Sequence, residues 1–128
     1  MGNSMMDTRL LVSVVDDDES VRESLPDLLR ELGFTARAFP SAEEFLECDT
    51  VSRTGCLILD FAMPGMTGPQ LQRELKRRHI QTPIIFITGH QDEVVRRDAI
   101  DRGAVECLLK PFTDTALLNA LNAALQIK

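Results

Sequence analysis

The segment that decides the fold is CLILDFAMPGMTG, residues 56–68. Its first part, residues 56–59, is apolar without alternation, which is typical of a strand buried on both faces of a parallel sheet. The apolar run ends at Asp60, and Gly65 and Gly68 then mark a loop. This order predicts a strand that stops at a carboxylate and continues through a glycine loop into a helix.

The same unit recurs along the chain. Apolar runs at 10–15, 84–87 and 107–109 are similar to 56–59, whereas 35–39 is more polar and is expected at a sheet edge. Apolar residues at helical spacing predict helices at residues 20–32, 41–46, 69–78, 93–102 and 117–125. Strict alternation of strands and helices implies right-handed crossovers with helices on both faces. We therefore expect a three-layer α/β fold, flavodoxin-like (βα)5, with the parallel strand order 2-1-3-4-5.

Two of these helices begin with a capping pattern. Ser20 with Glu23, and Ser41 with Glu44, fit a box in which a hydroxyl caps the helix and a carboxylate three residues later reciprocates. Pro26 falls inside the first helix, where it removes a backbone hydrogen bond and should kink the chain. We keep the helix because its apolar spacing continues across the proline.

Length and composition limit the class of protein. The chain has 128 residues, 44% hydrophobic and 27% charged, which predicts one globular domain. We assign residues 9–128 to this domain and residues 1–8 to a disordered N-terminal segment or a cloning remnant. The net charge of −6 argues against direct binding of nucleic acid. No apolar run approaches the roughly 20 residues of a membrane span, and three cysteines without metal-type spacing favour reduced thiols in the cytoplasm.

Polar residues collect at the predicted carboxyl ends of the strands. In an open parallel sheet these ends meet in one crevice, which is the usual ligand site. The residues expected to converge there are Asp16, Asp17, Asp18, Asp60, Thr88 and Lys110. Taken alone, each is a common helix cap, turn residue or solvated loop residue. Their joint occurrence at four strand ends in the right order makes coincidence the weaker explanation.

The chemistry of this set indicates phosphoryl transfer. Carboxylates in one crevice repel one another, and a hard divalent cation such as Mg²⁺ would neutralise them. Lys110 supplies a mobile positive charge, and Thr88 supplies a hydroxyl donor. A carboxylate beside a metal ion, an ammonium and a hydroxyl is what an aspartyl-phosphate site requires.

The chain resembles the receiver domain of bacterial two-component response regulators. The resemblance covers about residues 9–127. It rests on four segments: Val15-Asp16-Asp17-Asp18, Leu59 to Gly68, Ile87-Thr88-Gly89-His90, and Gly103-Ala104 through Leu109-Lys110-Pro111-Phe112. Several of these are most similar to receivers of the nitrogen-fixation regulator type, which precede helix-turn-helix output domains.

The resemblance implies a role for each residue of the crevice. Asp60 would be the phosphoacceptor, and Lys110 would pair with it and then with the phosphoryl group, while Thr88 would respond to phosphorylation. The Lys110–Pro111 peptide would be cis. The cation would be Mg²⁺, with Mn²⁺ as a substitute. Its ligands would be Asp17, Asp60, Asp16 directly or through water, and the backbone carbonyl of Ala62.

The resemblance also implies partners. A sensor histidine kinase would donate the phosphoryl group, and the face built from the fourth helix, fifth strand and fifth helix would change in response. Homodimerisation on phosphorylation is one expected result. The chain would be a signalling domain in the cytoplasm and not an enzyme, since it would catalyse only its own phosphorylation and dephosphorylation. Transcription would be controlled through an output domain outside this chain.

One position departs from the family pattern. Receivers usually carry Tyr or Phe three residues before the lysine, where the ring moves together with the threonine. Here that position is Cys107. We expect Cys107 to leave space beside Thr88 and to loosen the coupling between phosphorylation and the output face.

Two other functions fit parts of the pattern. Asp16 and Asp18 show the Asp-x-Asp spacing after a first strand that haloacid-dehalogenase-like phosphohydrolases use. The chain is short for that class and offers no cap region to enclose a substrate. The second alternative is a pseudo-receiver, a binding module that is never phosphorylated. Cys107 favours this alternative, and the complete set of acidic, threonine and lysine positions opposes it.

Overall fold

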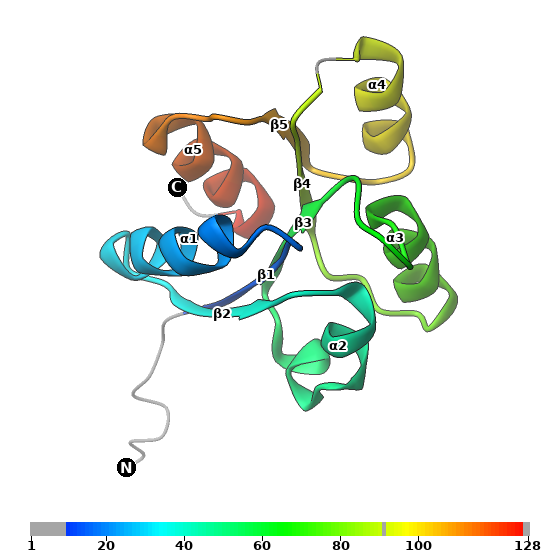
Figure 1. The fold of residues 1–128 in the computed structure, drawn as a ribbon, viewed down its shortest axis with the longest axis horizontal. Coiled ribbons are helices and arrows are strands. Elements are labelled where there is room, and N and C mark those ends of the chain that lie inside the picture. The colour runs from blue at the N-terminus through cyan, green and yellow to red at the C-terminus, as the bar shows by residue number, and fades with distance from the viewer. Residues whose placement is uncertain (1–9, 91, 127–128) are drawn as a thin grey trace.

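Five parallel strands form one sheet in the order β2-β1-β3-β4-β5 (Figure 1). The computed structural model describes residues 10–90 and 92–126, so the expectation for residues 1–8 lies outside the described residues. The strands are β1 (Leu11–Val15), β2 (Thr35–Phe39), β3 (Cys56–Asp60), β4 (Ile84–Thr88) and β5 (Glu106–Leu109). The helices are α1 (Glu19–Glu31), α2 (Ala42–Glu47), the 3₁₀ helix η2 (Asp49–Arg53), α3 (Gly68–Arg77), α4 (Glu93–Asp101) and α5 (Asp114–Leu125). The predicted three-layer α/β fold and its strand order are confirmed.

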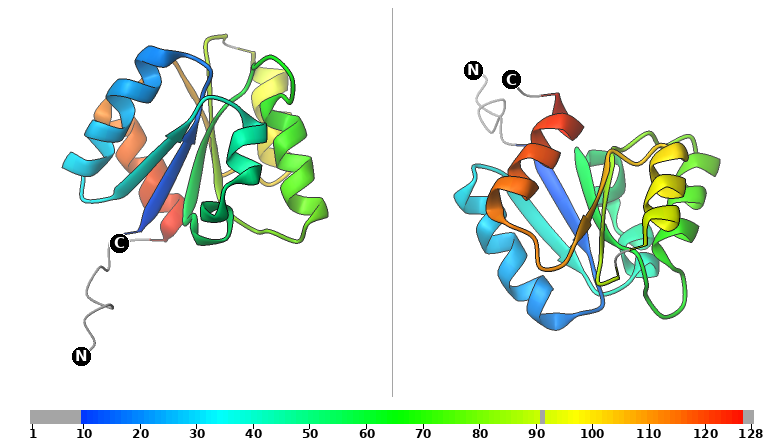
Figure 2. Two further views of the ribbon diagram at one scale, coloured as in Figure 1. Left: turned by 60° about the horizontal axis from the view of Figure 1, so that its bottom comes forward. Right: turned by 90° about the horizontal axis from the view of Figure 1, so that it is seen from above.

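The helices cover both faces of the sheet, with α1 and α5 on one side and α2, α3 and α4 on the other (Figure 2). Strand β3 shows why its sequence does not alternate. Leu57 and Leu59 belong to the core under α2 and α3, whereas Cys56 and Ile58 belong to the core under α1 and α5. Every residue of β3 is buried. A continuous apolar run is therefore what a central strand of this sheet requires.

The two outer strands differ from the central ones. Strand β2 lies at one edge, as its more polar sequence predicted, and β5 at the other edge has four residues. The outward-facing carbonyl of Ala36 on β2 accepts a hydrogen bond from Nη2 of Arg30 at 3.3 Å. A side chain from α1 therefore occupies part of the hydrogen-bonding edge of the sheet.

The start of α1 corrects one prediction. Asp18, not Ser20, is the residue that caps the helix, because its carboxylate accepts hydrogen bonds from the backbone and the hydroxyl of Ser20. The predicted box of Ser20 and Glu23 is wrong, since aspartate caps as well as serine and stands two residues earlier. The helix continues through Pro26, in agreement with its apolar spacing.

Helices α2 and α3 are also capped by a side chain at their first turn. The Ser41 hydroxyl accepts from the backbone of Glu44 at the start of α2, as predicted. Helix α3 begins with a full capping box of Thr67 and Gln70, which the sequence interpretation did not identify. The 3₁₀ helix η2 was not predicted either. These caps hold the loops that lead away from the carboxyl ends of the strands.

The three cysteines have reduced side chains and differ in their exposure. Cys56 and Cys107 are buried, Cys48 is partly exposed, and all three are free thiols. In the described part of the chain, none of the helices combines the length and the apolar character that crossing a bilayer needs.

Candidate functional site

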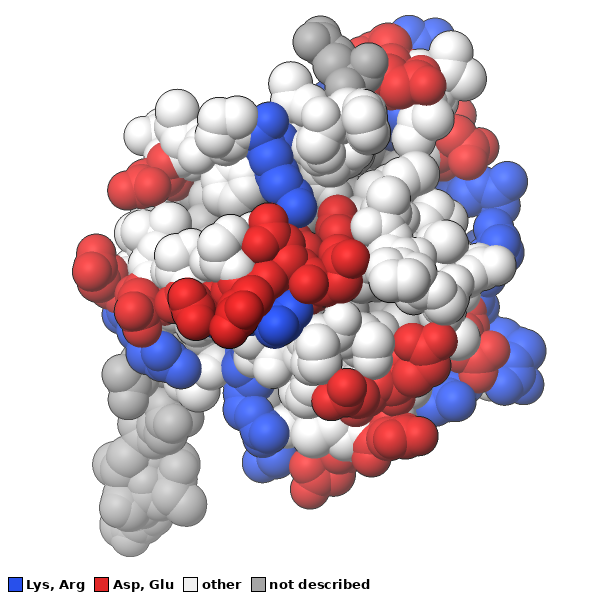
Figure 3. Space-filling model, in the orientation of Figure 1, with Lys and Arg blue, Asp and Glu red and all other residues white. Residues whose placement is uncertain are grey.

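The carboxyl ends of the central strands bring three aspartates together. Strands β1 and β3 are neighbours in register, with Val15 beside Leu59, so Asp16 and Asp60 end at the same level of the sheet. One carboxylate oxygen from each of Asp16, Asp17 and Asp60 lies within 4.8 Å of the others. Acidic side chains gather near the middle of the face seen in Figure 3. We call Asp16, Asp17 and Asp60 the carboxylate cluster.

The three aspartates differ in exposure and in the groups that hold them. Asp16 is fully buried, Asp60 is 6% exposed, and Asp17 is exposed. Oδ1 of Asp16 accepts a hydrogen bond from the backbone of Asp18 at 2.9 Å, and Nη1 of Arg22 donates to the Asp16 carbonyl at 3.0 Å. Asp16 is therefore fixed in place, while Asp17 extends to the solvent side. Asp18 caps α1 and is not part of the cluster.

Lys110 brings the positive charge of the site. Its Nζ donates to Oδ2 of Asp16 at 3.0 Å and lies 3.7 Å from Oδ1 of Asp60. The hydrogen bond to Asp16 was not foreseen from the sequence, which paired Lys110 with Asp60. The Lys110–Pro111 peptide is cis.

The electrostatics of the cluster show an excess of negative charge. Burial and then the nearby charge of Asp16 raise the pKa of Asp60 to about 7, although Lys110 opposes the shift. Burial lowers the pKa of Lys110, but the hydrogen bond and charge of Asp16 outweigh it and leave that pKa above its ordinary value. One ammonium faces three carboxylates, which is a mismatch that a divalent cation bound by oxygen ligands would correct. The donor set therefore fits a hard cation.

Thr88 ends β4 beside this cluster. Its hydroxyl accepts from the backbone of His90 at 3.2 Å and donates to the His90 carbonyl at 3.4 Å. Its own carbonyl accepts from the backbone of Lys110 at 2.8 Å. The Thr88 hydroxyl is thus hydrogen-bonded to the backbone of His90.

The loop after β3 passes close to Asp60. A Cβ at Gly68 would lie 2.5 Å from the Asp60 carbonyl oxygen and 2.9 Å from the Phe86 ring, so a side chain does not fit there. The sequence marked Gly68 as a loop glycine but gave no sign of this contact. Ala62 is exposed in the same loop, and the role of its carbonyl as a metal ligand stays a prediction.

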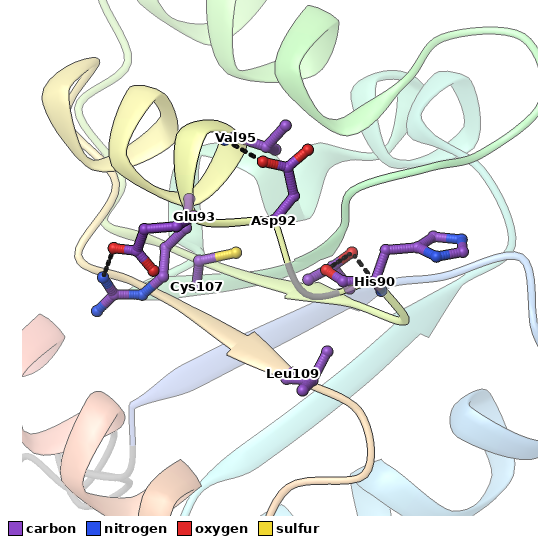
Figure 4. Close-up of a pocket in the computed structure, with 8 residues that line it drawn as sticks. His90, Asp92, Glu93, Val95, Cys107 and Leu109 are labelled. Atoms are coloured by element: carbon purple, nitrogen blue, oxygen red, sulfur yellow. Dashed lines mark hydrogen bonds and ion pairs between the residues drawn. The ribbon is translucent and has the colours of Figure 1, made fainter.

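Cys107 lies on β5 beside an open cavity. The cavity has a volume of about 240 Å³, and Thr88 and Cys107 both line it (Figure 4). The space that the sequence predicted beside Thr88 is therefore present. Burial raises the pKa of the Cys107 thiol, although Arg96 opposes the shift.

The comparisons with known proteins agree with this geometry. The response regulator receiver domain family matches residues 12–122. Nodulation protein W of Bradyrhizobium diazoefficiens is 46% identical over 123 residues, which are 96% of this chain and 54% of that protein. The response regulator TodT of Pseudomonas putida is 44% identical, with the same shares covered. This chain therefore spans about half the length of these relatives.

Solved structures give the same result. The response regulator StyR superposes with a TM-score of 0.85 at 46% identity, over 94% of this chain and 61% of that one. FixJ-N superposes with a TM-score of 0.84 at 39% identity, over 94% of this chain and 97% of that one. With its sheet order, its carboxylate cluster and these matches, the chain belongs to the response regulator receiver domain family.

Proposed function

We propose that Asp60 accepts a phosphoryl group from a sensor histidine kinase in a reaction that needs Mg²⁺. The observation that carries this proposal is the carboxylate cluster with Lys110 beside it. Asp60 ends a buried strand, lies 3.7 Å from the ammonium and is 6% exposed, whereas Asp16, which is closer to Lys110, is fully buried. The phosphohydrolase alternative is weakened because Asp18 caps a helix and Asp16 is fully buried.

The transfer itself is a displacement at phosphorus. A carboxylate oxygen of Asp60 forms the new P–O bond while the P–N bond to the kinase histidine breaks, and the leaving histidine keeps the electron pair and takes up a proton. The carboxylate must be ionised to attack. In this proposal Lys110 stays within reach of Asp60 and donates to the oxygens of the transferred group.

The metal would be held by the cluster. Asp17 and Asp60 are proposed as ligands, with Asp16 bound directly or through water and the Ala62 carbonyl completing the protein ligands. Mg²⁺, or Mn²⁺ in its place, neutralises charge on the carboxylates and the transferring oxygens when it is bound. Asp16 also orients Lys110 through the 3.0 Å hydrogen bond.

The response would be carried by the face of α4, β5 and α5. In this proposal Thr88 exchanges its bonds to His90 for one to the phosphoryl group, and the β4–α4 loop follows. A homodimer through this face is the expected result. The relatives named FixJ are transcriptional regulatory proteins, so we propose that this chain controls transcription in the cytoplasm through an output domain, with no nucleic acid bound by this segment.

Intact-mass measurement after incubation with acetyl phosphate and Mg²⁺ tests the proposal. The wild-type chain should gain one phosphoryl group, and Asp60→Asn should gain none. Asp27→Asn is the matched control, because Asp27 is an exposed α1 residue paired with Arg30. No gain in the wild type would indicate a pseudo-receiver, and steady turnover of small phosphate esters would indicate a phosphohydrolase.

A further inference from the structure

The cavity beside Cys107 has a mixed lining. It lies between α4 and the carboxyl ends of β4 and β5, and Figure 4 shows the Cys107 sulfur facing it from β5. Val95 from α4 and Leu109 from β5 add apolar surface, while Thr88 and His90 border it from the β4–α4 loop. The apolar surface of the cavity thus comes from Val95, Cys107 and Leu109, while its other lining residues are polar or charged.

An ion pair joins α4 to β5 beside the cavity. Nη2 of Arg96 on α4 lies 2.9 Å from Oε1 of Glu106 on β5, and the same oxygen accepts from the backbone of Cys107 at 2.9 Å. Glu106 therefore connects α4 with the strand that carries Cys107. Because the Cys107 side chain ends in a single sulfur, it leaves the cavity beside it unfilled.

The charges around the cavity disfavour an anion. The carboxylate of Asp92 already accepts from the first backbone N–H groups of α4, at Val94 and Val95. Arg96 is engaged by both Glu93 and Glu106. The positive groups that would attract an anion are thus matched by carboxylates of the protein itself, and an anionic ligand would meet Asp92 and Glu93 in the lining.

We propose that this cavity binds a neutral aromatic molecule the size of a single ring. Its volume of about 240 Å³ exceeds the space that such a ring needs, since an apolar cavity of about 150 Å³ accommodates benzene. The Cys107 sulfur, which faces the cavity, favours an aromatic ring over a saturated one. A hydroxyl on the ring has the carboxylates of Asp92 and Glu93 as acceptors among the lining residues.

Occupancy would matter because of where Thr88 lies. Thr88 lines the cavity and follows Ile87, which pairs with Asp60 across the sheet. A ring in the cavity would therefore lie against the residue through which the proposed response begins. Binding itself needs no phosphoryl group, so the inference is testable apart from the proposed function.

The test is a titration of the unphosphorylated chain with phenol, in which binding is monitored through the amide chemical shifts. Saturating shifts are expected at Thr88, Val95 and Leu109, with a dissociation constant on the order of 1 mM. Cys107→Phe, which fills the cavity, should weaken binding by at least about tenfold, whereas the isosteric Cys107→Ser should change it by less than about threefold. Benzoate should bind at least about tenfold more weakly than phenol, because of its charge.

Thermal melting of each variant checks that it is folded. Val95→Phe fills the cavity from the α4 side and provides a second test if Cys107→Phe does not fold. Shifts that do not saturate, that occur at the opposite end of the sheet, or that persist unchanged in a folded filling variant would overturn the proposal.

Discussion

Lys110 donates a hydrogen bond across 3.0 Å to Asp16, a fully buried residue that lies 94 positions earlier in the chain. The bond joins the end of β5 to the end of β1. Asp60, at the end of β3 between them, lies 3.7 Å from the same ammonium. The stability of the metal-free protein therefore depends on how one ammonium is shared by two buried carboxylates.

Lys110→Met should destabilise the metal-free protein, because it leaves Asp16 and Asp60 without their cation. Lys110 is 26% exposed, so the loss should fall below the 3–5 kcal/mol typical of a fully buried pair, at about 1–3 kcal/mol. When Asp16 is already replaced by asparagine, Lys110→Met should lower the unfolding free energy by less. Urea unfolding of the four chains of this double-mutant cycle measures the coupling, and strictly additive effects would contradict it.

Asp60 should make the metal-free protein less stable as the pH rises. Burial and the charge of Asp16 raise the pKa of Asp60 from 3.8 to about 7, so the folded state keeps a proton that the unfolded chain has lost. The part of the unfolding free energy that is linked to this proton is fully present below pH 3.8, and it is lost as the pH rises toward 7. One proton gives a slope of at most about 1.4 kcal/mol per pH unit.

Asp60→Asn is the variant that isolates this effect. It should flatten the pH dependence of the unfolding free energy in that window, while Asp27→Asn on the surface of α1 should retain it. Urea unfolding in the presence of a chelator is the measurement. If the slope survives in Asp60→Asn, another group carries the proton.

Asp17→Asn should weaken Mg²⁺ binding by about tenfold or more, because it removes the exposed member of the carboxylate cluster. Asp18→Asn is the matched control, since asparagine also caps helices well and Asp18 lies outside the cluster. Calorimetric titration with Mg²⁺ compares the two. Equal affinity in both variants would remove Asp17 from the ligand set.

Gly68→Ala should destabilise the fold by about 1–3 kcal/mol, because the added Cβ would press on the Asp60 carbonyl and the Phe86 ring. Gly89→Ala serves as the control, as a Cβ there meets nothing within 4 Å. Urea unfolding of the two variants gives the difference. A loss as large in Gly89→Ala would show that close contact is not the cause.

Thr88→Val should uncouple phosphorylation from dimerisation. In the wild type the hydroxyl can exchange its weak bonds to His90, at 3.2 and 3.4 Å, for one to the phosphoryl group. Valine has no hydroxyl to exchange. Sedimentation of phosphorylated and unphosphorylated protein should show a rise in dimer fraction for the wild type and a much smaller rise for Thr88→Val. An equal rise in both would exclude Thr88 as the trigger.

The fold and the membership of the cluster were largely predictable from local sequence. A run such as residues 56–59 is apolar because both of its faces are covered, and polarity can return only where the strand leaves the core. Asp16 and Asp60 occupy those positions, so the sheet order alone brings them together. These inferences need periodicity and topology but no side-chain coordinates.

Other features depended on competition between side chains. The sequence pattern favoured Ser20 as the cap of α1, whereas in the structure Asp18 takes that position two residues earlier. The sequence also offered Lys110 several carboxylates. The nearest one, Asp16, is held by a hydrogen bond from the backbone of Asp18 to its carboxylate and by one from the Arg22 guanidinium to its carbonyl. Sequence patterns contain the candidates for such contacts, whereas three-dimensional packing selects among them.

The hydrogen bond from the Arg30 guanidinium to the Ala36 carbonyl affects how the protein behaves at high concentration. An edge strand with free backbone groups is a template on which further chains can add and grow into fibrils. Here an incoming chain would have to displace Arg30 at β2, and at β5 it would find a strand of four residues. Both edges of the sheet thus resist the addition of further strands. Concentrated solutions of the protein should therefore stay free of amyloid-type aggregates.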